Sequence, residues 1–289
     1  MTSPKPDPIF SANARQHKRE RARAHFEDHD FIHKRAAEDV VDRFETVLKH
    51  FENVLLYGPG AALTAKALTP KANVGKVTIA DDISNGEDMV VAAAEALPFS
   101  DQQFDAVASV MALHAVNDLP KALAEARRVL KPDGLFIGIF PGERTLHELR
   151  WALQTAEAEV TGRVAPRVLP FVAVKDGGAL LQRAGFALPV GDVLELPITY
   201  QNPMRLFADL RGAGETSHLK KGPKGGLRRD VLAHALTLYQ KRFPSEDGGV
   251  HVTLELVALT GWAPHASQPQ PLKPGSATAS LQAAIQHQE

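Results

Sequence analysis

The sequence lacks cysteine and shows no excess of either charge. Without cysteine among its 289 residues, the chain cannot hold a disulfide, a thiolate zinc site or an iron–sulfur cluster, and it has no cysteine nucleophile. Its 33 basic and 34 acidic residues give a net charge of −1, which argues against a general nucleic-acid or membrane-surface binder. Apolar residues make up 44% of the chain, which is ordinary for one or two globular domains.

Long hydrophobic runs are also missing. No segment approaches the roughly 18 apolar residues of a transmembrane helix. The first eight residues are polar and proline-rich, without the apolar core of a signal peptide. We therefore expect a cytoplasmic chain with no integral membrane segment. No metal site is predicted, because the histidines considered as ligands are scattered: His114, His147, His218, His234 and His251.

Short apolar segments alternate with amphipathic ones along the first half of the chain. This alternation predicts strands at 53–57, 76–80, 89–94, 104–113 (including the exit loop) and 135–140, and helices at 36–48, 61–68 and 118–130. The second half predicts helices at 144–161, 176–184, 203–210 and 230–243, and strands at 190–198 and 250–262. We expect an α/β, Rossmann-like sheet of seven mostly parallel strands with helices on both faces. The last two strands should lie at one edge, one of them antiparallel.

Composition divides this chain into four parts. They are a basic N-terminal arm (1–35), a Rossmann-like core (36–143), helical cap insertions with the last two strands (144–262), and a tail rich in Pro, Gln and Ser (263–289). The basic stretch 15–23 is interpreted as a solvated helix face, with contact to an acidic partner as the alternative. The basic segment 220–229 is interpreted as a surface loop, with a lid or docking patch as the alternative.

A glycine turn and an acidic pair mark a candidate nucleotide site. Gly58 and Gly60 follow the first expected strand and precede a helix, whose N-terminus offers free N–H groups. Asp81 and Asp82 end the second strand about twenty residues later, where a carboxylate can accept from ribose hydroxyls. These residues leave two interpretations open, a dinucleotide site and an S-adenosylmethionine (SAM) site.

The segment 95–134 favours the second interpretation. Its motifs resemble those of class I SAM-dependent methyltransferases: Glu95-x-Leu97-Pro98-Phe99, Phe104-Asp105 and the run RVLKPDG at 128–134. Further motifs resemble the family of respiratory complex I assembly factor 5 and its bacterial relatives, which are cousins of the malonyl-carrier-protein methyltransferase of biotin synthesis. They include Leu113-His114, the run 116–120, the run 145–150 and Asp209-Leu210-x-x-x-Gly214-Glu215, and the resemblance extends over about 10–281.

The resemblance implies a class I methyltransferase fold and SAM as cofactor. It also implies a protein partner such as a respiratory complex I subunit and, for the best-studied branch, hydroxylation of an arginine rather than methyl transfer. His114 follows the fourth strand and is a candidate general base. The candidate cofactor-binding residues are Gly58, Gly60, Asp81, Asp82, Glu95, Leu97 and Met111.

The candidate cofactor site departs from the family pattern. Leu56 and Ala93 stand where acids usually contact SAM, Ala62 replaces the third glycine of the loop, and Ala115 replaces a common tryptophan. Losing two charge-assisted hydrogen bonds, at about 1.5–3 kcal/mol each, predicts weak or absent SAM binding. Three hypotheses follow: a SAM-using enzyme, an assembly or binding factor that keeps the fold without SAM, and a dinucleotide-dependent oxidoreductase. The motifs of 95–134 favour the first two.

Overall fold

A seven-stranded sheet forms the centre of the computed structural model, which describes residues 7–69, 71, 73–84, 88–223 and 225–269. The strand order is β3-β2-β1-β4-β5-β7-β6. The first five strands are parallel, β7 runs antiparallel to β5, and β6 runs antiparallel to β7. The predicted fold class and the antiparallel strand are therefore confirmed. The bounds are β1 Phe51–Tyr57, β2 Val74–Asp81, β3 Met89–Val91, β4 Phe104–Val110, β5 Leu130–Pro141, β6 Ala187–Tyr200 and β7 Val250–Trp262.

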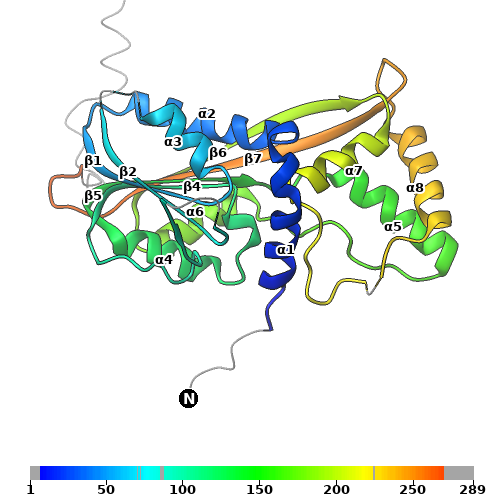
Figure 1. The fold of residues 1–289 in the computed structure, drawn as a ribbon, viewed down its shortest axis with the longest axis horizontal. Helices are drawn as coiled ribbons and strands as arrows, with labels where there is room; N and C mark the ends of the chain where they lie inside the picture. The colour runs from blue at the N-terminus through cyan, green and yellow to red at the C-terminus, as the bar shows by residue number, and fades with distance from the viewer. Residues whose placement is uncertain (1–6, 70, 72, 85–87, 224, 270–289) are drawn as a thin grey trace, which may run out of the picture.

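Helices cover both faces of the sheet (Figure 1). Consecutive residues of β1 point to opposite faces, so that Leu56 packs in the apolar cluster of α2 and α3, whereas Leu55 packs in that of α4. Both side chains are fully buried. The helical bounds are α1 Ala12–Ala22, η1 (a 3-10 helix) Arg23–Asp28, α2 Phe31–Thr46, α3 Ala61–Leu68, η2 (3-10) Leu113–Ala115, α4 Leu119–Val129, α5 His147–Thr161, α6 Val174–Arg183, α7 Pro203–Gly212 and α8 Arg229–Arg242.

The antiparallel pair of β6 and β7 extends beyond the parallel strands. In Figure 1, α5, α7 and α8 gather along its far part, on the other side of α1 from the parallel strands. Helix α5 packs against α8 and against β7. These helices therefore lie beyond the edge where the parallel strands end, which is where ligands bind in open α/β sheets.

Helix α1 crosses that edge (Figure 1). Hydrogen bonds of Ser11, the residue before the helix, fix its N-terminus. Ser11 caps it by accepting from the amide of Ala14 (3.3 Å), and its own amide donates to the carbonyl of His218 (2.9 Å). Arg15 and Arg19 on this helix are buried. The solvated face predicted for the stretch 15–23 is thus wrong for these two side chains. Residues 1–6 of the predicted arm (1–35) and residues 270–289 of the predicted tail (263–289) lie outside the described residues.

Candidate functional site

The two predicted loop glycines are required by the packing of the fold itself. Gly58 has φ of +102°, and its amide donates to the carbonyl of Ala80 (2.9 Å). A Cβ atom at Gly58 would lie 2.7 Å from the carbonyl oxygen of Val110, and one at Gly60 would overlap the Val110 side chain. The turn after β1 therefore packs directly against the end of β4, and side chains larger than glycine are excluded at positions 58 and 60 even without a ligand.

Asp81 is an internal ion-pair partner rather than a free acceptor. The guanidinium of Arg19 donates to both of its oxygens, at 2.8 and 2.5 Å, and the amide of Asp82 donates to it at 2.8 Å. The side chains of Arg19 and Asp81 are 6% and 2% exposed. Burial by itself lowers the pKa of Arg19, but the hydrogen bond and charge of Asp81 raise it overall. The acidic partner of the N-terminal basic stretch therefore lies within the same chain.

Asp82 differs from Asp81 because it lines a pocket. Arg15 and Arg19 both donate to its carboxylate, and the side-chain amide of Gln16 donates to its backbone carbonyl (3.0 Å). Burial raises the pKa of Asp82, while the two guanidinium groups lower it, with a net increase. Only Asp82 of the acidic pair could therefore offer an oxygen to a ligand in this pocket.

This outer pocket, of about 270 Å³, lies between α1 and the ends of β1, β3 and β4. The loop after β4 holds α1 against it, because Asn117 exchanges two side-chain hydrogen bonds with the backbone of Phe10, at 2.8 and 3.1 Å. Glu95 accepts from the amide of Asn117 (3.1 Å). Small apolar side chains with Asp82 and Glu95 form its wall, which fits the nucleoside half of SAM. The lining includes Tyr57, Ala92, Ala93, Ala94, Ala112, Ala115 and Val116.

A second, inner cavity lies between the start of α2 and α7 and contains the predicted residues Met111 and His114. Glu215 reaches it between two buried histidines, with its carboxylate oxygens 3.1 Å from Nε2 of His114 and 3.5 Å from Nε2 of His33. Burial by itself raises the pKa of Glu215, but His114 and His33 lower it well below its usual value. Nδ1 of His114 is buried and has no hydrogen-bond partner among the described residues, so it is available to a bound group.

A second carboxylate borders the inner cavity on another side. Asp209 accepts from the hydroxyl of Tyr200 (2.7 Å) and lies 2.8 Å from Nδ1 of His29. Burial and this hydrogen bond raise the pKa of Tyr200. Apolar side chains form much of the remaining wall, including Phe31, Ile32, Leu146, Leu169, Phe171 and Leu206. The cavity thus combines an apolar lining with two partly buried carboxylates.

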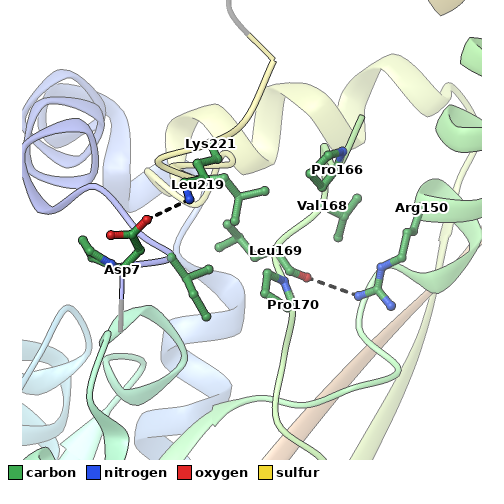
Figure 2. Close-up of a pocket in the computed structure, with 10 residues that line it drawn as sticks. Asp7, Arg150, Pro166, Val168, Leu169, Pro170, Leu219 and Lys221 are labelled. Atoms are coloured by element: carbon green, nitrogen blue, oxygen red, sulfur yellow. Dashed lines mark hydrogen bonds and ion pairs between the residues drawn. The ribbon is translucent and has the colours of Figure 1, made fainter. Parts of the chain in front are cut away.

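A third cavity, of about 530 Å³, is separated from the inner one by Leu169, which lines both. Figure 2 shows its apolar wall and its two polar contacts: Lys221 donates to Asp7 (2.8 Å), and Arg150 donates to the carbonyl of Leu169 (3.3 Å). None of the predicted site residues lines this cavity.

The predicted site residues do not all line one pocket. Asp82 and Glu95 line the outer pocket, and Met111 and His114 line the inner cavity. Leu97 lies in the apolar core, with its amide bonded to Glu125 (3.0 Å), and lines neither. Of the departures from the family pattern, Ala93 and Ala115 face the outer pocket, whereas Leu56 is enclosed in the core.

His29 in the inner cavity and His33 beside Glu215 were missed by the sequence prediction. His25, His29 and His33 are spaced by four, a pattern that would place them on one face of a continuous helix. The chain breaks this face by changing from η1 to α2, and His29 and His33 approach different carboxylates. Within the described ranges, no group of three or more potential ligands could hold a metal ion. No helix among them is long and apolar enough to cross a membrane.

The strand order and the turn after β1 define a class I methyltransferase fold. A family profile described as a methyltransferase domain matches residues 55–138. The solved YcgJ protein of Bacillus subtilis is 19% identical, with a TM-score of 0.53 over 80% of this chain and 99% of that one. A methyltransferase-like protein of Bacillus halodurans gives the same score over 78% of this chain and 100% of that one. These likenesses agree with the fold.

Sequence comparison identifies the family within this fold. The chain is 38% identical over 262 residues to the human protein named arginine-hydroxylase NDUFAF5, mitochondrial, covering 87% of this chain and 75% of that protein. The zebrafish protein of that name is 37% identical, covering 88% and 81%. A malonyl-[acyl-carrier protein] O-methyltransferase of Halorhodospira halophila is 32% identical, covering 80% and 81%. The chain belongs to the NDUFAF5 family, which confirms the resemblance and favours the methyltransferase interpretation over the dinucleotide one.

Proposed function

We propose that this protein acts on an arginine side chain of a protein partner, with the inner cavity as the site that receives it. The observation that carries the proposal is the pair of partly buried carboxylates, Asp209 and Glu215, at one largely apolar cavity. The relatives named arginine hydroxylases add the substrate class. A guanidinium is the cation best matched to carboxylates in partly buried surroundings, because it is planar and weakly hydrated.

The size of the inner cavity supports this assignment. Its volume is about 60 Å³, and a water-sized group needs roughly 10–15 Å³, so it holds about four such groups. A guanidinium has one carbon and three nitrogens, and its methylene stem suits the apolar wall. Nδ1 of His114 would face this group with an unused hydrogen-bonding position. His114 would then position the substrate or move a proton.

For the cofactor, we propose that the outer pocket holds the nucleoside half of SAM, with Asp82 and Glu95 as acceptors. When bound, SAM supplies an electrophilic methyl group. The protein's own residues orient the nucleoside and exclude water from the pocket through α1. We expect the affinity to be weaker than micromolar, because Asp82 is already paired with Arg15 and Arg19 and Ala93 offers no carboxylate.

The partner we propose is a subunit of respiratory complex I, on the basis of the family motifs at 145–150 and 209–215. The cytoplasmic location also stays a proposal, tested by cell fractionation.

The experiment that tests the proposed arginine modification is mass spectrometry of complex I subunits from cells with and without this gene. An added oxygen on an arginine means hydroxylation, and an added methylene means methylation. An arginine unchanged between the two strains would refute the enzymatic proposal.

One observation favours a second candidate function, an assembly or binding factor that does not use SAM. Both carboxylates at the end of β2 are engaged by α1, and the side chain of Asp81 is only 2% exposed. Calorimetry with SAM and with S-adenosylhomocysteine separates the two functions. Heat of binding from either ligand supports the cofactor, whereas its absence together with preserved complex I assembly supports the binding factor.

Restoring an acid at Ala93 is expected to strengthen SAM binding about tenfold or more. Ala93 lines the outer pocket and is exposed, so an aspartate can reach a ligand there, and one charge-assisted hydrogen bond contributes about 1.5–3 kcal/mol. Titration calorimetry of Ala93→Asp measures this change. Ala96→Asp is the control, because Ala96 is exposed but does not line the pocket. Equal affinities of the two variants would contradict the placement of the cofactor.

Replacing Glu215 with glutamine is expected to reduce arginine modification about ten- to hundredfold, the loss of one charge-assisted contact. Complementation of the deletion strain, followed by mass spectrometry, measures the change. Glu246→Gln, at an exposed position, should behave as wild type. Asp209→Asn tests the second carboxylate separately. If both cavity variants are folded by circular dichroism and fully active, the inner cavity is not the substrate site.

A further inference from the structure

A groove on the outer side of α1 gathers positive charge. It has a volume of about 770 Å³ and lies between α1, η1, α7 and the segment 216–227. We call it the basic groove. Its lining contains no aspartate or glutamate, and consists of Lys18, Arg21, Ala22, His25, His29, Arg167, Phe207, Ala208, Leu210, Arg211, Gly212, Thr216, Ser217, Gly226 and Leu227.

Three of these cations have no carboxylate partner in the part of the chain that the structure describes. Lys18 donates to the carbonyl of Ser217, and Arg21 donates to the carbonyl of His17 (3.4 Å). Arg211, near the end of α7, forms no ion pair. Burial and the charge of Arg21 lower the pKa of Lys18, in keeping with cations that repel one another.

Some basic side chains of the protein are instead paired with carboxylates. Arg15 and Arg19 on the inner side of the same helix bind carboxylates, and so do Arg43 and Arg128 elsewhere. Arg167, at the edge of the groove, pairs with Glu157 (2.6 Å). What distinguishes the groove is that Lys18, Arg21 and Arg211 gather in one lining without aspartate or glutamate, in a chain whose net charge is −1.

The groove also has apolar side chains, namely Phe207, Leu210 and Leu227, which are partly buried. We propose that the basic groove docks an acidic, amphipathic segment of the protein partner, with carboxylates on Lys18, Arg21 and Arg211 and an apolar side chain on this floor. The fit rests on charge complementarity, which selects and orients partners at an interface. A nucleic acid fits less well, because the whole chain has no basic excess to follow a phosphate backbone.

The position of the groove connects it to the proposed function, on which this inference rests. His29 and Leu210 line both the basic groove and the inner cavity. A Cβ atom on Gly212 would overlap the ring of His29, so this wall is thin and tightly packed. A segment bound in the groove therefore lies directly beside the cavity that receives the arginine. The groove would select the partner, and the cavity would select the side chain.

Fluorescence anisotropy with the full chain tests the docking step alone. The probe is a labelled helical peptide with glutamates on one face and leucines on the other. Its comparison ligands are the same peptide with glutamines in place of glutamates, and a labelled single-stranded RNA. We expect the glutamate peptide to bind at least about tenfold more tightly than the glutamine peptide, with affinity falling as salt rises.

Charge reversal in the groove identifies the surface. The double variant Arg21→Glu, Arg211→Glu should weaken binding of the glutamate peptide at least about tenfold. Both side chains are exposed, so the fold should tolerate the change. The control Lys66→Glu, Lys175→Glu makes the same charge change at exposed positions outside the groove and should leave binding unchanged.

Three outcomes would overturn the proposal: equal binding of the two peptides, tighter binding of the RNA, or equal effects of the groove and control variants. None of these measurements requires SAM or turnover. If the peptide does not dock but the arginine is still modified, only the docking proposal is refuted. If the peptide docks but no arginine is modified, the catalytic proposal is refuted instead.

Discussion

Replacing Arg19 with methionine is expected to lower the free energy of unfolding by about 3–5 kcal/mol, because removing one partner of a buried ion pair leaves the other charge uncompensated. Arg19 holds both oxygens of Asp81 and also contacts Asp82. Urea denaturation measures the change. Arg21→Met is the control on the same helix, at an exposed position, and should change the free energy by no more than about 0.5 kcal/mol.

A compensating variant separates lost charge from lost packing. Replacing Asp81 with leucine in the Arg19→Met background removes the stranded carboxylate, and apolar replacement of a buried pair is often neutral. We expect the double variant to recover most of the lost stability. A single variant as stable as the Arg21→Met control, or a double variant no more stable than the single, would contradict the role of this pair.

Acidification is expected to destabilise the protein through His218 by about 2 kcal/mol between pH 7 and pH 4.5. Burial, followed by the charge of Arg15, lowers the pKa of His218 from 6.5 to about 4. The folded protein keeps this histidine neutral while the unfolded chain binds a proton. Its contribution to stability is therefore highest above pH 6.5 and is lost as pH falls toward 4.

Urea denaturation at the two pH values measures this effect. The variant His218→Gln should lose about 2 kcal/mol less than wild type over this interval. His17→Gln should match wild type, because the side chain of His17 is 77% exposed. Glu215 acts at lower pH, since its pKa is lowered from 4.5 and its contribution is lost only as pH falls below that value. A wild-type stability that is flat from pH 7 to 4.5 would contradict the burial of neutral His218.

Local sequence patterns predicted the strands well. The apolar run before Gly58 became β1 at the middle of the sheet, and the 250–262 segment became β7 with the same bounds. The predicted ends of strands and helices were less accurate where the sequence pattern continued past the last regular hydrogen bond. The strand predicted with its exit loop at 104–113 ends at Val110, and the loop begins at Met111, which has φ of +61°, before 113–115 forms a 3-10 helix. The helix predicted from 144 begins at His147, after Leu146 at φ +57°.

The site was harder to predict because its contacts join distant segments. Arg19 and Asp81 are separated by 62 positions, and His114 and Glu215 by 101. The sequence of a basic helix does not show which of its side chains face the protein interior. The burial of Arg15 and Arg19 could therefore not be predicted, nor could the exposure of Lys18 and Arg21 to the groove. The missing acid at Leu56 was visible in the sequence. Its enclosure in the core was not, and it makes Leu56→Asp a poor way to restore SAM binding.

Helix α1 gives the outer pocket and the basic groove a common wall. Its inner side chains, Arg15 among them, close the outer pocket, while Lys18 and Arg21 belong to the basic groove. If a docked segment shifts this helix, it changes the affinity of the pocket for its ligand, and thermodynamic reciprocity requires the ligand to change the affinity for the segment by the same factor. A coupling of about 1–3 kcal/mol, typical of such linkage, would make cofactor loading and partner capture mutually dependent events.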